Sequence, residues 1–230
     1  MLDSKPQHGI QQFWKIKHPI SGGLHFLGFL GAITAIIYYL AHPNRITQLD
    51  GRIYSYVFLT TMALLYLSSS LYHLLVTSEV ITARLRKLDH AMISLFIAGT
   101  ITPFCLSFEN PTVKFSIIAS IWLLALTGVV FTSLFTSTSR WARVGVYVAL
   151  SFFGLFAVFY GIQQLSAHVL IWLVTGGVAY LLGSVVYALK RPNPFPKYFG
   201  FHEIWHIFVL VGCTCHFVAV ESYLSDSFKT

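Results

Sequence analysis

Two histidines near the end of the chain, His202 and His206, stand four residues apart in a largely apolar segment. On a helix, residues four apart lie on one face, about one turn from each other. Two earlier polar residues, His73 and Asp89, are predicted to lie at the same depth of the fold. Imidazole and carboxylate are ligand types that zinc uses, and ionisable groups at membrane depth usually mark a functional site. The spacing therefore predicts a metal site embedded in a membrane.

These residues match the needs of a catalytic zinc ion, which has three protein ligands and one open position. We predict His73, His202 and His206 as the ligands. Asp89 is either a fourth ligand or the base that takes a proton from water activated by the metal. Ser69 lies one turn before His73, and we expect it to orient His73 or to donate a hydrogen bond to a developing oxyanion. Asp89 and Ser69 are thus the candidate catalytic residues.

Other polar residues near this site receive supporting roles. We expect His25, near the start of the first span, and His90, beside Asp89, to support the ligands or to pack next to them. The segment from His202 to His206 also reads H-E-x-x-H, the zinc-protease signature in which Glu203 would be the general base. Because Glu203 lies about 100° around the helix from His202 and Asp89 is a rival base, a protease is the minor alternative. Four further histidines are predicted at span ends or in loops, without a role: His8, His18, His42 and His168.

The composition predicts an integral membrane protein that must hold these residues on helices. Hydrophobic residues make up 56% of the 230 residues and charged ones 10%, whereas soluble chains carry about 25% charged residues. The apolar residues come in runs of the length that crosses a bilayer. The net charge of +7 comes from basic residues that flank these runs, so anionic lipid headgroups, and not nucleic acid, are the expected partners. Three cysteines within apolar stretches are expected to behave as small hydrophobes and to form no disulfide framework: Cys105, Cys213 and Cys215.

Breaks between the apolar runs predict an all-α bundle of seven transmembrane helices. The predicted spans are 21–41, 53–76, 88–107, 113–136, 142–161, 168–189 and 200–222. Residues 1–20 are expected to form an interfacial segment, residues 21–222 the transmembrane domain, and residues 223–230 a short tail outside the cytoplasm.

The distribution of lysine and arginine predicts the orientation of these spans. Eleven basic residues fall on one side: Lys5, Lys15, Lys17, Arg84, Arg86, Lys87, Arg140, Arg143, Lys190, Arg191 and Lys197. Four fall on the other: Arg45, Arg52, Lys114 and Lys229. We therefore expect the N-terminus in the cytoplasm and the C-terminus outside. This orientation places the predicted ligands and Asp89 in the cytoplasmic half of the membrane.

Three sequence blocks resemble the motifs of the haemolysin III family, within the progestin and adipoQ receptor superfamily. They are Ser69-Ser70-Leu71-Tyr72-His73, Lys87-Leu88-Asp89-His90 and Phe201-His202-Glu203-Ile204-Trp205-His206. A fourth block departs from the family pattern, because His18 and Ser21 stand where the family often has an acid and an amide, while His25 is kept. With the seven predicted spans, the resemblance covers essentially the whole chain.

The resemblance implies zinc on His73, His202 and His206, with Asp89 at the bound water. It also implies a lipid amide substrate, since relatives are associated with ceramide hydrolysis. We therefore favour a zinc-dependent hydrolase of a membrane-lipid amide or ester, in a multi-pass protein of the bacterial inner membrane. The alternative is a non-enzymatic receptor, channel or cytolysin with a structural zinc, since the family name implies haemolytic activity.

Overall fold

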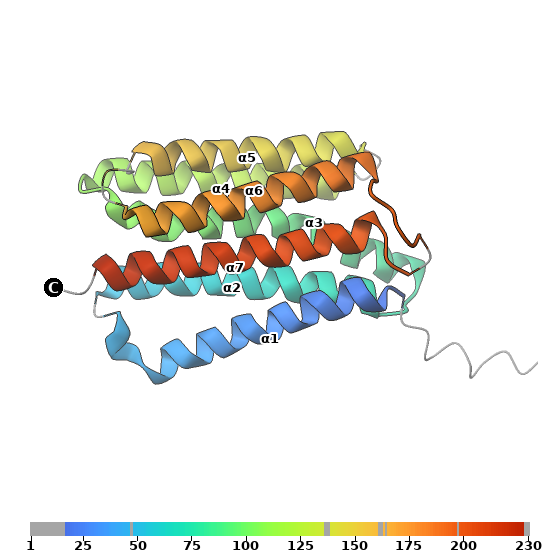
Figure 1. The fold of residues 1–230 in the computed structure, drawn as a ribbon. Coiled ribbons are helices and arrows are strands. Elements are labelled where there is room, and N and C mark those ends of the chain that lie inside the picture. Colours follow the sequence, from blue (N-terminus) through green and yellow to red (C-terminus); the bar gives the residue numbers. More distant parts are fainter. Residues whose placement is uncertain are drawn as a thin grey trace, which may run out of the picture.

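The described residues form seven α-helices that run side by side in one bundle (Figure 1). The computed structural model describes residues 17–46, 48–135, 139–160, 163, 165–196 and 198–227. The helices are α1 (Pro19–Ala41), α2 (Leu49–Leu74), α3 (Glu79–Ile101), α4 (Pro111–Leu134), α5 (Arg140–Tyr160), α6 (Ala167–Leu189) and α7 (Phe201–Ser227). Two 3-10 segments, η1 (Pro43–Arg45) and η2 (Thr102–Ser107), follow α1 and α3. The predicted all-helical architecture is confirmed. Most of the predicted interfacial segment and the last three residues of the predicted tail lie outside the described residues.

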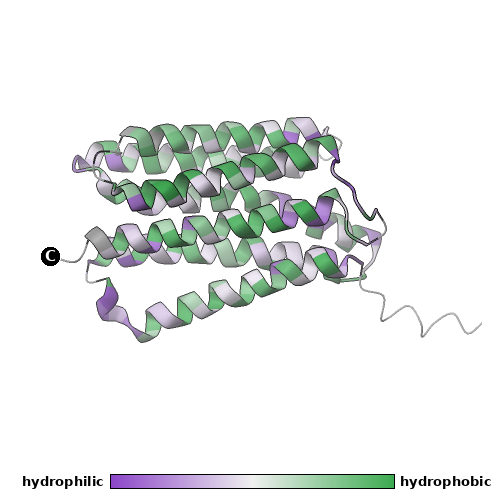
Figure 2. Ribbon diagram, viewed as in Figure 1, coloured by the Kyte–Doolittle hydropathy of each residue, from purple (hydrophilic) through white to green (hydrophobic). Residues whose placement is uncertain are grey.

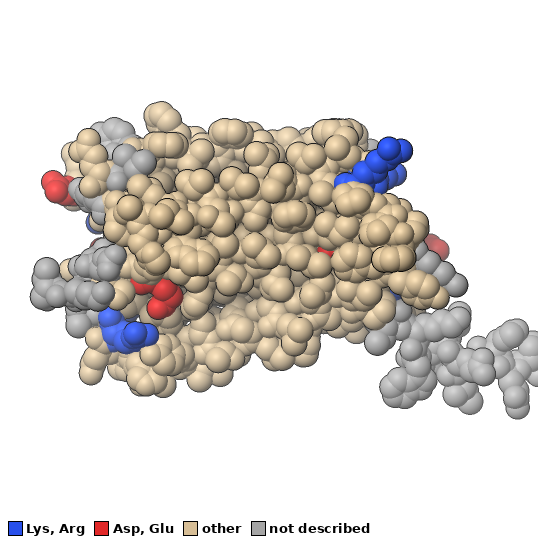
Figure 3. Space-filling view, in the orientation of Figure 1, with Lys and Arg blue, Asp and Glu red and all other residues tan. Residues whose placement is uncertain are grey.

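The bundle has the surface of a membrane protein. Within the described residues, six helices are long and apolar enough to cross a membrane, and α5 is not among them. Hydrophobic residues cover the lengths of the helices, and hydrophilic ones gather towards their ends and connections (Figure 2). Lysine and arginine side chains likewise lie at the two ends of the visible face (Figure 3). Large apolar side chains such as Leu27, Leu123 and Phe156 point outward, as hydrocarbon contact requires. The chain is a multi-pass helical membrane protein.

Local sequence signals explain where several helices begin. The Ser78 side chain caps α3 by accepting a hydrogen bond from the Ile81 amide at 3.4 Å, and Asn110 caps α4 through the Thr112 amide at 2.9 Å. Such side-chain oxygens satisfy amides that have no partner within the helix. Proline at the first position of α1 and α4 adds the fixed φ angle that a helix start needs.

The helices extend beyond several predicted boundaries. Helix α3 begins at Glu79 instead of residue 88, because the Ser78 cap starts the helix before the apolar run does. Its first turns carry the basic residues that the prediction assigned to a loop. Helix α2 begins at Leu49 instead of 53, and α7 continues to Ser227 instead of ending at 222. Hydrophobicity marks the part of a helix that lies in the membrane, but it does not mark the helix ends.

The most extensive helix contacts join α6 to α7 and α1 to α2, and small residues contribute to them. A Cβ atom added to Gly176 on α6 would meet the His216 ring and, at 3.1 Å, the backbone oxygen of Gly212 on α7. The neighbouring Gly177 has open space in the same position. Only the glycine that faces α7 therefore serves close packing, which is a common use of small residues in membrane bundles.

The three cysteines are buried and unpaired, as the sequence predicted. Cys213 on α7 accepts a hydrogen bond from the Tyr180 hydroxyl of α6 at 3.1 Å, and Tyr66 of α2 also hydrogen-bonds its sulfur. Phenol groups buried within a bundle need such partners. Cys213 therefore links three helices in the middle of the bundle.

Candidate metal centre

Three histidines from two helices bring their side chains together at one end of the bundle. His73 lies in the last turn of α2, and His202 and His206 lie in the first two turns of α7. The His202 Nε2 atom lies 3.4 Å from His73 Nε2 and 3.2 Å from His206 Nε2. One ligand atom from each residue lies within 4.8 Å of the other two. Three nitrogens thus point at one small volume.

This spacing fits a tetrahedral zinc ion. Zinc binds imidazole nitrogen at roughly 2.0–2.1 Å, so two such ligands at a tetrahedral angle lie about 3.3–3.4 Å apart. The separations of His202 Nε2 from His206 Nε2 and from His73 Nε2, 3.2 and 3.4 Å, agree with that edge length. All three atoms are Nε2, which leaves each Nδ1 for another partner. The donor set is therefore suited to zinc, and three imidazoles leave one position of the tetrahedron open.

His25 of α1 supports one of these histidines. Its Nε2 atom lies 3.0 Å from Nδ1 of His206, and both side chains are almost completely buried. If His206 uses Nε2 for a metal, its Nδ1 carries the proton and donates it to His25. His25 then has its own proton on Nδ1, which is buried without a partner among the described residues. The position of His25 is the one that the sequence assigned to a supporting residue.

Asp89 of α3 interacts with Ser69 of α2. The Ser69 hydroxyl hydrogen-bonds the Asp89 carboxylate across α2 and α3, and Ser69 is one helical turn before His73. Among the described residues, the group of mutually close ligand atoms contains the three histidines and not Asp89. The His73 Nδ1 atom has no hydrogen-bond partner there either. Ser69 thus interacts with Asp89 and makes no hydrogen bond to His73 Nδ1 among the described residues, whereas the first of its two predicted roles was to orient His73.

Glu203 is engaged elsewhere. One carboxylate oxygen accepts a hydrogen bond from the Gly200 amide at 2.8 Å, and the other accepts one from the Ser21 hydroxyl at 3.0 Å. The first contact satisfies an amide at the start of α7, and the second ties α7 to α1. Glu203 thus has a structural partner on each oxygen, which weakens its candidacy as a general base. Sequence reasoning assigned no role to Ser21.

His18 lies at the site although the sequence analysis gave it no role. Its backbone amide donates to the backbone oxygen of His73 at 2.8 Å. Its ring centroid lies 5.5 Å from that of His73 and 6.4 Å from that of His202. Partial desolvation and the charge of Lys17 lower the pKa of His18, although much of the side chain is accessible. The spacing from His18 to His25, two turns of helix, was the available signal.

His90 contacts α5 through its backbone. Its backbone oxygen accepts a hydrogen bond from the Tyr147 hydroxyl at 3.0 Å. The side chain is half-buried and is not part of the group of close ligand atoms. His90 therefore helps to hold α3 against α5, next to Asp89.

Cationic and aromatic side chains surround the end of the bundle that contains the histidines. The Arg140 guanidinium lies 5.4 Å from the Tyr187 ring and 5.6 Å from the Phe201 ring. The Tyr187 ring is in turn 6.1 Å from that of His202. On the other side, Lys17 lies 4.5 Å from the Tyr72 ring. These contacts attach the N-terminus of α5 and the segment before α1 to the helices that carry the site.

Comparison with known proteins identifies the family. The family described as "Haemolysin-III related" matches residues 13–217. The chain belongs to the haemolysin-III-related family. This membership, within the progestin and adipoQ receptor superfamily, confirms the resemblance inferred from the three motif blocks.

Named relatives of this haemolysin-III-related chain include bacterial and animal proteins. It is 32% identical over 209 residues to the hemolysin-3 homolog of Bacillus subtilis (strain 168), covering 90% of this chain and 95% of the relative. It is 30% identical over 210 residues to hemolysin-3 of Bacillus cereus, covering 91% and 93%. The adiponectin receptor protein of Drosophila melanogaster is 27% identical over 214 residues, covering 86% of this chain and 48% of the receptor.

Proposed function

We propose that this haemolysin-III-related protein is a zinc-dependent hydrolase of an amide or ester in a membrane lipid. The proposal rests on the convergence of three Nε2 atoms. The His202 Nε2 atom lies 3.2 Å from that of His206 and 3.4 Å from that of His73. The Asp89 carboxylate, which interacts with Ser69 one helical turn before His73, is not one of these ligands. Three imidazoles with an additional base are the arrangement of a catalytic zinc site and not of a closed structural one.

His73, His202 and His206 would hold the zinc ion. When bound, zinc polarises a carbonyl group and makes a water molecule more acidic. Asp89 would accept the proton from the attacking water and pass it to the leaving amine or alcohol, as general bases in hydrolases do. Ser69 would hold the Asp89 carboxylate in place, and His25 would hold the His206 ring. The acyl chain of the substrate would lie between helices, with its carbonyl at the histidines.

We further propose that α5 is the seventh span and that the three-histidine end of the bundle faces the cytoplasm. Helix α5 lies alongside α4 and α6 over a similar length (Figure 1). In the described residues, eight basic residues lie at or near the three-histidine end: Lys17, Arg84, Arg86, Lys87, Arg140, Arg143, Lys190 and Arg191. Three lie towards the opposite end: Arg45, Arg52 and Lys114. This bias supports a cytoplasmic N-terminus in the bacterial inner membrane.

A non-enzymatic receptor or cytolysin with a structural zinc is the second candidate. The names of the relatives favour it, since two are called hemolysin-3 or its homolog and one an adiponectin receptor protein. In this case zinc would only tie α2 to α7.

The substitution Asp89→Asn separates the two candidates. If Asp89 is the base, the variant keeps about one zinc per chain, because the three imidazoles remain, and loses roughly 10²- to 10⁴-fold in activity. Purified protein in lipid nanodiscs would be assayed for zinc by mass spectrometry, for thermal stability, and for fatty acid released from a ceramide and from a phospholipid. Asp50→Asn, an exposed acid at the far end of the bundle, is the matched control.

Two results would contradict the hydrolase. Joint loss of zinc and stability in Asp89→Asn would make Asp89 a ligand of a structural site. The proposal would also be contradicted if zinc-loaded protein released no more fatty acid than a His206→Ala variant, because the protein would then have no hydrolase activity.

A further inference from the structure

Two cationic side chains flank the metal centre, and the proposed hydrolysis as described so far uses neither of them. Lys17 precedes α1, and Arg140 is the first residue of α5. Lys17 is exposed and Arg140 is half-buried. In the part of the chain that the structure describes, neither side chain forms an ion pair with a carboxylate. The three-histidine end of the bundle therefore presents two positive charges to an anionic ligand.

Arg140 is fixed beside one of the candidate metal ligands. Its guanidinium lies 5.4 Å from the Tyr187 ring and 5.6 Å from the Phe201 ring, and Nη1 donates a hydrogen bond to the Tyr187 backbone oxygen at 3.5 Å. The Tyr187 ring is 6.1 Å from the His202 ring. A guanidinium has five N–H donors, and arginine can bind a phosphate group through two parallel hydrogen bonds.

Lys17 lies beside a second candidate ligand. Its ammonium group is 4.5 Å from the Tyr72 ring, and the centroid of that ring is 4.6 Å from the centroid of the His73 ring. The next residue, His18, donates its backbone amide to the His73 backbone oxygen at 2.8 Å, which ties this segment to the end of α2. One cation therefore lies next to the ligand on α2, and the other lies next to a ligand on α7.

This arrangement matches the chemistry of a phospholipid. Its acyl carbonyl is a few covalent bonds from the phosphate, which stays in the polar layer of the membrane while the acyl chains lie in the hydrocarbon. A carbonyl at the three histidines would thus leave the phosphate near Lys17 and Arg140, at the ends of the helices. No enclosed cavity is needed, because the headgroup remains at the end of the bundle. A ceramide has a neutral headgroup and would leave both cations without a partner.

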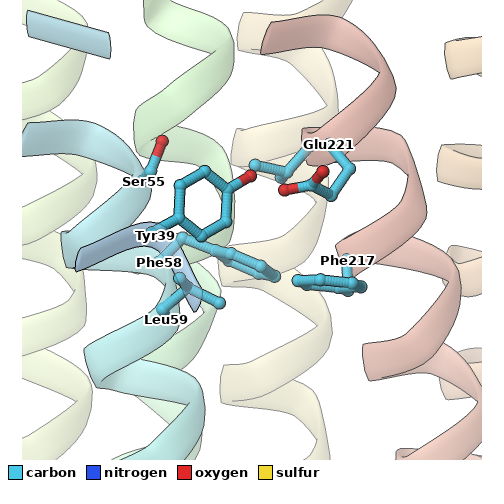
Figure 4. A pocket seen from close by; sticks show the side chains of 7 residues that line it. Tyr39, Ser55, Phe58, Leu59, Phe217 and Glu221 are labelled. Carbon is cyan, nitrogen blue, oxygen red and sulfur yellow. The ribbon is translucent and has the colours of Figure 1, made fainter. Parts of the chain in front are cut away.

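The opposite end of the bundle supplies a matched control. There the Arg45 guanidinium lies 5.4 Å from the Tyr38 ring, the same distance as that between Arg140 and Tyr187. A carboxylate also lies towards this end, since Figure 4 shows the Glu221 side chain directed towards the Tyr39 hydroxyl. A negative charge there opposes the binding of an anion. Replacing Arg45 therefore removes a similar cation–aromatic contact where no phosphate site is proposed.

We propose that Lys17 and Arg140 bind the phosphate group of the lipid that is hydrolysed, so that the substrate is a phospholipid and not a ceramide. This inference rests on the proposed hydrolase function and names the substrate class of the same site. The tyrosine rings hold the two cations at the membrane surface, and the acyl carbonyl lies at the three histidines.

The first experiment measures binding without hydrolysis, through the thermal stability of the full chain in a non-ionic detergent. The probe is a short-chain diether phosphatidylglycerol, which has a phosphate but no acyl bond. The matched diether glycerol lacks the phosphate, and inorganic phosphate lacks the chains. A ligand that binds only the folded state raises Tm with its concentration. We expect the probe to bind more tightly than either control compound.

Variants of the chain then assign the binding to the two cations. Arg140→Gln and Lys17→Gln should each weaken binding of the probe about five-fold, whereas Arg45→Gln should leave it unchanged. Arg140→Lys keeps the charge and should bind more tightly than Arg140→Gln, which separates the charge from the packing of the guanidinium on its rings. Equal affinity for the probe and the diether glycerol, equal losses in Arg140→Gln and Arg45→Gln, or equally tight binding of inorganic phosphate alone would each overturn the proposal.

The second experiment compares fatty acid release from an acyl phosphatidylglycerol and from a ceramide by the same preparations. Faster release from the phospholipid, with a smaller preference in Arg140→Gln than in the natural chain, is the expected result. Equal release from both lipids would keep the hydrolase and overturn the phosphate selection. Phosphate-dependent binding without release from either lipid would overturn the hydrolase, and with it the assignment of a substrate, while the binding of phosphate by Lys17 and Arg140 would stand.

Discussion

At the scale of single residues, two carboxylates near the histidines differ in what they contact. Asp89 is held by one hydroxyl, from Ser69, whereas Glu203 is bonded on both oxygens, to Gly200 and Ser21. The position of Glu203 next to His202 in the sequence therefore does not make it the general base. The H-E-x-x-H string would assign the base to Glu203, while the hydrogen bonds on both of its oxygens argue against that role.

The substitution Glu203→Gln tests this distinction. The amide oxygen of glutamine can still accept a hydrogen bond from the Gly200 amide, so we expect normal zinc content, activity within a few-fold, and a loss of about 0.5–2 kcal/mol of stability. Zinc analysis, lipid turnover and thermal unfolding would be measured on the same preparation. An activity loss of roughly 10²-fold or more would instead make Glu203 the base and restore the protease alternative.

His25 is expected to tune metal affinity without binding the metal. Replacing it with leucine removes the acceptor for the His206 Nδ1 proton, and we expect zinc binding to weaken about 10- to 100-fold. His25→Gln keeps an acceptor oxygen and should lose less. Competition with a chromogenic chelator measures the affinity, and His168→Gln, outside the site, is the control. Equal affinities in the natural chain and His25→Leu would show that this contact does not support the metal.

The sequence predicted the candidate metal ligands better than it predicted the residues that contact them. His73, His202 and His206 were recognisable because spacing and span direction brought them to one depth, and the structure places them together. The contacts of His18 and Ser21 were not predictable in the same way, because they depend on how α1 packs against the ends of α2 and α7. A histidine at a helix start and a serine within an apolar run have many possible partners, and only the packing selects one.

At the scale of helices, a pair of adjacent glycines gives a direct test of packing. Gly176→Ala should destabilise the protein by about 1–3 kcal/mol, because its Cβ would press into His216 and the Gly212 backbone. Gly177→Ala meets open space and should be neutral or slightly stabilising, since alanine favours helix over glycine. Thermal unfolding of the two variants in one detergent measures the difference. Similar stability of both would mean that α6 and α7 do not approach as closely as described.

Helix ends were the least predictable part of the fold. The apolar runs located all seven helices, but Ser78 starts α3 nine residues before the predicted span. A capping serine followed by charged residues is a local signal, whereas the span prediction used only long apolar runs. The difference matters for the site, because Asp89 is consequently in the third turn of a continuous helix and not at its start.

At the scale of the whole molecule, the charge distribution predicts the topology. A tag at Lys5 should be accessible only from the cytoplasm and a tag after Phe228 only from outside, because basic residues concentrate at the three-histidine end. Labelling of intact cells and of inverted membrane vesicles distinguishes the two sides. Detection of both tags on one side would mean that the seven helices do not all cross the bilayer, and it would contradict the proposed topology.

The burial of all three natural thiols has a practical consequence for such experiments. Cys105, Cys213 and Cys215 are each at most 5% exposed, and Cys213 is further occupied by the Tyr180 hydroxyl. Buried thiols in apolar surroundings are inert towards reagents that need an accessible thiolate. The natural chain is therefore expected to react little with maleimide reagents. Single cysteines introduced at surface positions, such as Glu79 or Glu109, would report on bilayer sidedness, spin-label distances or fluorophore mobility without prior removal of the native sulfur atoms.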